Sequence, residues 1–189
     1  MPEQVTNISA GKPRVGGAIF RAPLDTDLPT NATDELDSAF EDLGAVSDDG
    51  VTNSNSIDVE TLKTWSGAVA LTTQTGKEDK FTFKLLEGLN VNVLKAIYGE
   101  DNVSGDIDSG ISVSVDDSEA EECAWVIDMI TRGDTLKRLV IPDGKLTSLE
   151  DIVYNGSEAF GYGCEITAFK DSNNKSHYEY IVKGTEEES

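Results

Sequence analysis

The hydrophobic pattern is clearest in the stretch 51–98. The run Phe81-Thr-Phe-Lys-Leu85 alternates apolar and polar residues, which predicts a half-buried strand with three apolar side chains on one face. Over residues 90–98 the apolar spacing becomes helical, with Asn90 as the N-cap and Gly99 as the residue that ends the helix. A strand that leads directly into a short helix can bury both apolar faces in one core.

The segment that precedes this strand, residues 50–80, is long and polar at both ends. Large apolar side chains along it include Val59, Leu62, Trp65, Val69 and Leu71. A connection of this length without a packed element of its own is uncommon in a compact domain and is usually functional. Two interpretations stay open: an arm laid against another subunit, or an ordinary hairpin in which strand 65–74 turns at 75–78 into strand 80–87.

Upstream of this segment, the pattern predicts a short strand over 16–22 and then a second helix. Thr33 can cap that helix, because acidic residues follow it and favour the positive end of a helix. Leu36, Phe40 and Leu43 recur at helical spacing along one stripe. We therefore expect a short surface helix that this stripe holds against the body.

Downstream, apolar and polar residues alternate in several short runs. The expected strands are 111–115, with Ile111, Val113 and Val115 facing inward, 123–131, 135–141, 146–154, 160–168 and 177–183, with turns at 142–145 and 171–175. Several short strands with two small helices indicate a mainly β (α+β), antiparallel domain. We expect one domain over 15–183, a flexible N-terminus at 1–14 and a short acidic tail at 184–189.

The chain is strongly acidic, since 36 Asp and Glu against 15 Lys and Arg give a net charge of −21. This charge disfavours nonspecific attraction to nucleic acid or to an anionic membrane. A surface that DNA slides past without adhering would be built acidic, and solubility or adaptation to high salt is the simpler explanation. The run Asp106-Ile-Asp-Ser-Gly110 does not predict a calcium loop, because Gly105 stands where the first carboxylate ligand is required.

Cys123 and Cys164 lie in apolar, strand-like runs and are expected to be free buried thiols, because nothing marks the chain as secreted. The first residues have neither the basic nor the apolar region of a signal peptide, and no run approaches the roughly 18 apolar residues of a membrane span. We therefore expect a protein made in a cytoplasm, with no membrane partner.

Residues that could support catalysis are sparse. His177 is the only histidine, lies near a predicted turn and is expected at the surface. The two cysteines form no metal-binding pair, and Gly161-Tyr-Gly163 is followed by a strand pattern instead of the helix of a dinucleotide-binding loop. The sequence therefore predicts no enzyme, no metal site and no cofactor.

Five stretches carry a resemblance to a known family. They are Gly16–Phe20 with Ala22-Pro-Leu24, Leu43–Gly50, Trp65-Ser-Gly67, Phe81–Lys95 with Tyr98-Gly99, and Gly163–Phe169. In their order and pattern, which cover most of 15–183, the chain resembles the major tail tube protein of long-tailed, noncontractile (siphovirus-type) bacteriophages.

The resemblance implies a small β sandwich or barrel flanked by a helix, whose subunits form rings, usually of six, around a β-lined channel. Segment 50–80 matches the long loop that reaches the next ring in that family. The resemblance also implies a location in the virion tail after synthesis in the host cytoplasm. Expected partners are copies of the same chain, the tape measure, tail terminator and distal tail proteins, and genomic DNA that passes through the channel.

Acids that face such a channel should lie on strand faces opposite the core residues. Asp128, Glu165 and Glu179 meet this condition, because each is out of phase with apolar neighbours in its strand. The alternative function is an acidic β-sandwich binding module or a DNA mimic. Such a protein would bind a basic partner and stay monomeric or dimeric, whereas a tube subunit would polymerise.

Overall fold

The computed structural model describes residues 9–14, 18–157 and 159–184. Most of the N-terminus that was expected to be flexible (1–14), and all but the first residue of the acidic tail (184–189), lie outside the described residues. Within 9–14, Lys12 and Pro13 form a short strand that pairs with Ile130 and Met129. This part of the N-terminus is therefore held against the body.

The described residues are mostly in β-strands. The strands are β1 (Lys12–Pro13), β2 (Ile19–Pro23), β3 (Glu41–Asp42), β4 (Val46–Lys63), β5 (Val69–Leu85), β6 (Val103–Ser104), β7 (Ser112–Val113), β8 (Glu122–Thr131), β9 (Thr135–Leu149), β10 (Tyr162–Ala168) and β11 (Tyr178–Lys183). The helical elements among these residues are α1 (Val91–Tyr98) and a short 3-10 helix, η1 (Glu100–Asn102). The mainly β, antiparallel fold that the pattern predicts is confirmed.

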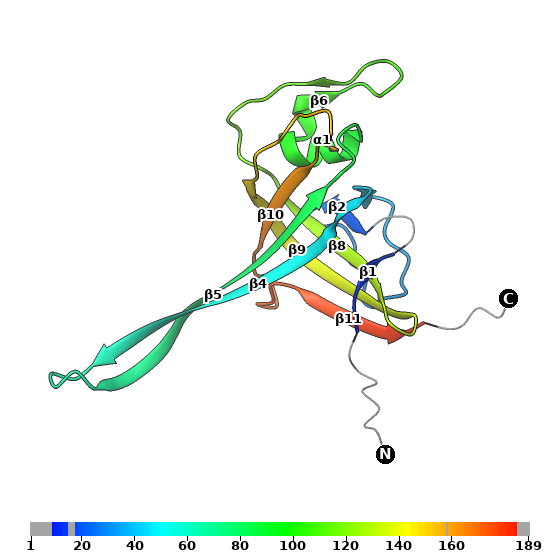
Figure 1. Cartoon of the computed structure of the whole chain (residues 1–189). Coiled ribbons are helices and arrows are strands. Elements are labelled where there is room, and N and C mark those ends of the chain that lie inside the picture. The colour runs from blue at the N-terminus through cyan, green and yellow to red at the C-terminus, as the bar shows by residue number, and fades with distance from the viewer. Residues whose placement is uncertain (1–8, 15–17, 158, 185–189) are drawn as a thin grey trace.

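One antiparallel sheet forms the body, with the strand order β3-β2-β8-β9-β10-β5-β4, while β1 pairs with β8 and β11 pairs with β9. The sheet curls, so that β5 and β10 lie across β8 in a second layer (Figure 1). The ring centroids of Phe83 in β5 and Trp125 in β8 are 6.3 Å apart, although two strands separate β5 from β8 in the sheet order. The fold is therefore a sandwich made from one folded-over sheet.

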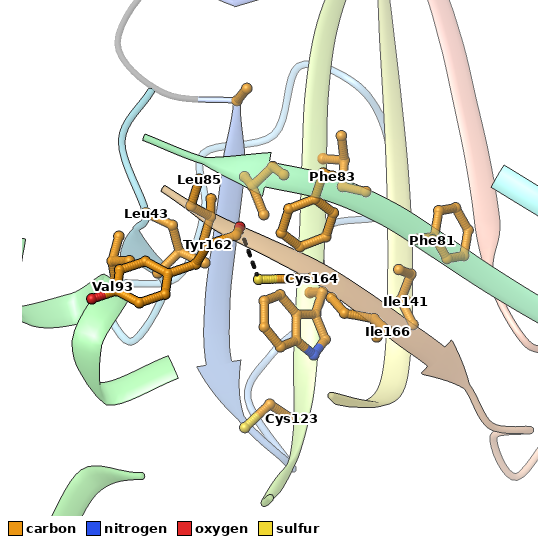
Figure 2. Close-up of a cluster of buried hydrophobic side chains, with 14 of the residues drawn as sticks. Leu43, Phe81, Phe83, Leu85, Val93, Cys123, Ile141, Tyr162, Cys164 and Ile166 are labelled. Atoms are coloured by element: carbon orange, nitrogen blue, oxygen red, sulfur yellow. Dashed lines mark hydrogen bonds between the residues drawn. The ribbon is translucent and has the colours of Figure 1, made fainter. Parts of the chain in front are cut away.

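The core between the two layers contains the residues that alternation predicts. Phe81, Phe83 and Leu85 of β5 are buried, and on the neighbouring strand Cys164 and Ile166 lie opposite Phe83 and Phe81. Figure 2 shows these side chains pointing into one cluster. Because full burial of such a side chain is worth about 1.5–3 kcal/mol, this cluster is the main source of stability for the body.

Helix α1 covers one end of the sandwich and begins where the sequence predicts. The Asn90 side chain accepts a hydrogen bond from the Asn92 N–H, and the Gly99 N–H donates to the Lys95 carbonyl at the other end. Val93 and Leu94 of the helix are buried in the core. The apolar stripe of the helix therefore closes the sandwich at the end where β5 stops.

The helix expected after Thr33 does not form. Residues 30–40 make hydrogen-bonded turns, in which Asn31 Oδ1 accepts from the Asp34 N–H at 2.6 Å and Asp34 Oδ2 accepts from the Thr30 N–H at 2.9 Å. The Asp34 carbonyl, which would accept a bond within a helix, instead accepts one from Arg138 at 2.8 Å. Tertiary contacts and local side-chain bonds therefore override the helical spacing.

The turn expected at 142–145 is also wrong, because these residues lie inside the long strand β9. The Trp125 indole N–H donates to the Gly144 carbonyl at 3.0 Å, and a Cβ on Gly144 would come within 2.9 Å of the Trp125 ring. Pro142 falls in the gap between Val140, where pairing with β11 ends, and Gly144, where pairing with β10 begins. Its missing N–H therefore interrupts neither ladder.

The strand expected at 111–115 is reduced to β7, which pairs only with β6 in a separate two-stranded sheet. Val115 is three-quarters exposed and Val113 is also exposed, so the alternate residues do not face the core together. The Ser114 N–H donates to the Asn102 carbonyl at 2.8 Å, which ties this segment to η1 and away from the main sheet.

Candidate functional site

Strands β4 and β5 form one long hairpin, so the segment 50–80 is both a hairpin and an extended arm. Its turn lies at 64–68, where the Thr64 N–H donates to the Ala68 carbonyl at 2.8 Å and Gly67 takes φ +85°. The turn expected at 75–78 is wrong, because those residues lie inside strand β5, which pairs with β4 there. We call residues 54–78 the arm.

The arm projects from the body as a two-stranded ribbon, and no other part of the chain that the structure describes lies above or below it (Figure 1). Asp79 is the last buried residue of β5 before the arm, and from there to Val69 the strand extends roughly 30 Å at about 3.3 Å per residue. Two-stranded ribbons are at best marginally stable in water alone. A ribbon of this length therefore indicates a surface that another molecule covers.

Large apolar side chains are exposed along the arm. They are Ile57, Val59, Leu62, Trp65, Val69 and Leu71, each more than half exposed, with Trp65 at the tip fully exposed. Leu62 lies directly opposite Leu71, whereas Ile57 and Val59 are on the other face of the ribbon because side chains alternate along a strand. Both faces of the arm therefore carry exposed apolar residues.

The three acids predicted to face a channel each lie against a basic side chain. Glu165 Oε1 is 3.3 Å from Lys80 Nζ, and Glu179 Oε2 is 2.9 Å from Lys137 Nζ. Both carboxylates are partly exposed. Glu165 and Glu179 therefore present carboxylates to solvent, while the charge of each is largely balanced by a lysine of the same subunit.

Asp128 differs from the other two because it is buried. Arg138 holds its carboxylate in a two-pronged ion pair, with Nε–Oδ1 at 2.6 Å and Nη2–Oδ2 at 2.7 Å, and Arg138 is only 1% exposed. The remaining Arg138 nitrogen donates to the carbonyls of Asn31 and Asp34. Segment 24–40 therefore packs against the Asp128–Arg138 pair, and Arg14 Nη1 lies 3.5 Å from Asp128 Oδ2, so this acid presents almost no charge to solvent in the subunit.

Part of the surplus negative charge lies at the α1 end of the body, in segment 100–122, which has nine carboxylates and no Lys or Arg. Its carboxylates belong to Glu100, Asp101, Asp106, Asp108, Asp116, Asp117, Glu119, Glu121 and Glu122. Among the described residues, those with an ion pair are Glu100, which contacts Arg21 and Lys95, and Glu119, which contacts Lys145.

His177, expected at the surface, is mostly buried, and its Nδ1 contacts the carboxylate of Asp79. Within residues 9–14, 18–157 and 159–184, no group of His, Cys, Asp or Glu is arranged to hold a metal ion. The helix found in that same part of the chain is too short to cross a membrane.

The two cysteines are free and buried, as expected. Burial raises the pKa of the Cys164 thiol to about 12 and also raises that of Cys123. The Cys164 Sγ–H donates to the Tyr162 carbonyl (Figure 2). Both thiols are therefore poor nucleophiles in the folded protein.

We expect the folded protein to resist thiol alkylation. At pH 8 a thiol with a pKa near 12 has roughly 10³-fold less thiolate than an ordinary one, and burial blocks access as well. Iodoacetamide labelling followed by mass spectrometry should modify Cys123 and Cys164 in urea-unfolded protein only. Rapid labelling of the native protein would contradict the buried environment that the structure gives them.

The structure is thus a β sandwich with one long arm that exposes apolar residues on both faces. The sequence matches the family model described as phage tail tube protein over residues 10–189, nearly its whole length. The chain belongs to the phage tail tube protein family. A search of curated proteins found no match to the sequence.

Membership in the tail tube protein family has direct consequences for function. A tail tube protein is a structural component of the virion and not an enzyme, so the prediction of a non-catalytic role is confirmed. The family also implies association with copies of the same chain and with other phage tail proteins. The match supports a tail tube subunit over an acidic binding module or DNA mimic.

Proposed function

We propose that this tail tube protein assembles into rings, six copies to a ring, which stack into a tube through which genomic DNA passes during ejection. In this assembly the arm of one copy lies on a copy in the next ring. The tape measure, tail terminator and distal tail proteins contact the finished tube. The observation that carries the proposal is the exposed apolar arm.

The length and composition of the arm support contact with neighbouring copies. An arm that extends roughly 30 Å from the body can reach a second subunit. Exposed apolar residues on both of its faces would bury surface against neighbours on two sides, and Trp65 at the tip is the kind of residue that anchors an interface. Val59, Leu62, Val69 and Leu71 complete the proposed contact set.

The charge of the chain supports a channel that DNA does not adhere to. Each copy carries a net charge of −21, and a wall of one sign repels the phosphate backbone. We assign Glu165 and Glu179 to the channel face, because both are partly exposed on strands of the sheet. Asp128 is left out of this assignment because it is buried and paired with Arg138.

The purified protein is expected to form rings or tubes at high concentration, because contact with another copy would bury the apolar residues of the arm. Negative-stain electron microscopy and sedimentation velocity over a concentration series would measure this. A chain that stays monomeric at every concentration and salt condition tested would contradict the proposal.

The anchoring role of Trp65 has a matched test. Trp65→Ala should shift assembly to higher protein concentration, since removal of an interface aromatic commonly costs about 2 kcal/mol or more. Thr61→Ser, a polar change on the same arm, should leave assembly as it is. Equal assembly by both variants would remove Trp65 from the contact set.

A further inference from the structure

The arm leaves the body at a buried carboxylate. Asp79 is 2% exposed and lies two residues before Phe81, which is fully buried, on the same face of β5. The next residue on that face toward the tip, Lys77, is exposed. Asp79 therefore marks the boundary at which the ribbon loses the support of the core.

Three side-chain donors from two parts of the chain converge on Asp79. Asn53 Nδ2 in β4 donates to Oδ1 at 2.7 Å, and Ser176 Oγ donates to Oδ2 at 2.6 Å. His177 Nδ1 also contacts Oδ2. An ionised carboxylate only accepts hydrogen bonds, so Nδ1 carries the proton in this contact.

The two donors beyond the arm come from the connection between β10 and β11, which lies beside the base of the arm (Figure 1). The His177 ring also packs edge-on against Phe81, with centroids 5.3 Å apart. Its other nitrogen, Nε2, is 3.8 Å from Glu179, which is itself paired with Lys137 of β9. The contacts of Asp79 therefore join the arm to a separate part of the body.

The ionisation of Asp79 agrees with this geometry. Burial alone would raise its pKa, but hydrogen bonds from Ser176, Asn53 and His177, together with attraction to His177, lower the pKa overall. The carboxylate is therefore charged at neutral pH. Hydrogen bonds to a charged acceptor are stronger than those between neutral groups.

We propose that Asp79 is a positioning residue that sets the direction in which the arm leaves the body. Asn53 fixes the carboxylate from the β4 side, and Ser176 and His177 fix it from the β10–β11 connection. Without this anchor the two-stranded ribbon swings about its base, because no other layer supports it. The proposal rests on the proposed role of the arm in assembly, since a fixed direction lowers the entropy cost of docking on a neighbour.

The experiment measures arm direction and assembly separately. Nitroxide labels at Thr61→Cys on the arm and Lys170→Cys on the body report the distance distribution by pulsed electron spin resonance, on protein that size-exclusion chromatography shows to be monomeric. Both positions are exposed, whereas the native cysteines are buried. Asp79→Asn keeps the shape but removes the charge and leaves at least one donor unpaired.

Asp79→Asn should broaden the interspin distribution about twofold and raise the concentration needed for assembly about tenfold, equivalent to about 1.4 kcal/mol. Ser176→Ala should broaden it less, because one of three donors is lost. Glu60→Gln, which removes an exposed arm carboxylate, should change neither quantity. Circular dichroism would check that the body of each variant is folded.

The outcomes separate the two proposals. An unchanged distribution in folded Asp79→Asn overturns the positioning role, whether or not the wild type assembles. A broadened distribution in a protein whose wild type never assembles supports the positioning role and refutes the proposed assembly. If Asp79→Asn does not fold, the interspin distance distribution of Ser176→Ala provides the test. An unchanged distribution in that variant overturns the proposal.

Discussion

Replacement of Arg138 by methionine is expected to lower the free energy of unfolding by about 3–5 kcal/mol, because it leaves the buried charge of Asp128 with only a 3.5 Å contact to the partly exposed Arg14. The same change removes the donor that holds the Asn31 and Asp34 carbonyls, so segment 24–40 loses its attachment to β9. Urea denaturation followed by circular dichroism would measure the loss. A change below about 1 kcal/mol would show that the pair is not buried as described.

Two variants separate two contributions to the lost stability: the poorly compensated charge of Asp128 and the loss of packing. Arg138→Met combined with Asp128→Leu should recover most of the lost stability, because replacement of both members of a buried pair by apolar residues is often neutral. Lys137→Met breaks the partly exposed pair with Glu179 and should cost less than about 1 kcal/mol. If the double variant is as unstable as Arg138→Met, the cost comes from the freed carbonyls of segment 24–40.

The core of this protein could be predicted from local alternation, because the side-chain period of a strand does not depend on its neighbours. Phe81, Phe83 and Leu85, and the matching residues of β10, are buried where the pattern places them. Helix α1 could be predicted for a similar reason, since its cap and its apolar stripe are both local signals. The local sequence of each of these elements is therefore sufficient to predict it.

The elements that were predicted wrongly depend on distant residues. The helical spacing of Leu36 and Phe40 was overridden because Arg138, about a hundred residues away, binds the carbonyls of that segment. The Pro142–Gly144 turn signal was overridden because Gly144 admits the Trp125 ring against the backbone of a continuous strand. In both cases the competing signal comes from a tertiary contact.

The candidate site was predictable in part. The length and polarity of segment 50–80 indicated an arm, and Ser66-Gly67 could have marked its turn, because that dipeptide is a turn signal. Asp79 was not predictable, since nothing in Lys77-Glu-Asp-Lys80 distinguishes one buried carboxylate from its exposed neighbours. The alternation in β8 predicts that Asp128 is exposed, because the sequence does not show that Arg138 pairs with it and that segment 24–40 packs against this pair.

Removal of the arm is expected to abolish assembly while the body stays folded. The design replaces residues 57–77 by Asn-Gly, which joins Ser56 to Glu78, residues that lie opposite each other in the hairpin. Asn-Gly favours the tight turn that such a two-residue connection needs. Asp79 and its contacts with Asn53, Ser176 and His177 lie outside the deletion, so the base of the ribbon is kept.

The size of the effect follows from the apolar surface that the arm would bury. Burial of the five large apolar side chains of the proposed contact set, at about 1 kcal/mol or more each, corresponds to more than about a 10³-fold change in association constant. Sedimentation velocity should therefore show monomers at concentrations where the full-length chain forms tubes. The melting temperature should change little, because none of the deleted residues belongs to the core cluster and nearly all of them are exposed. Tubes formed by the shortened chain would mean that rings stack through the body alone, and the exposed apolar arm would then need another partner.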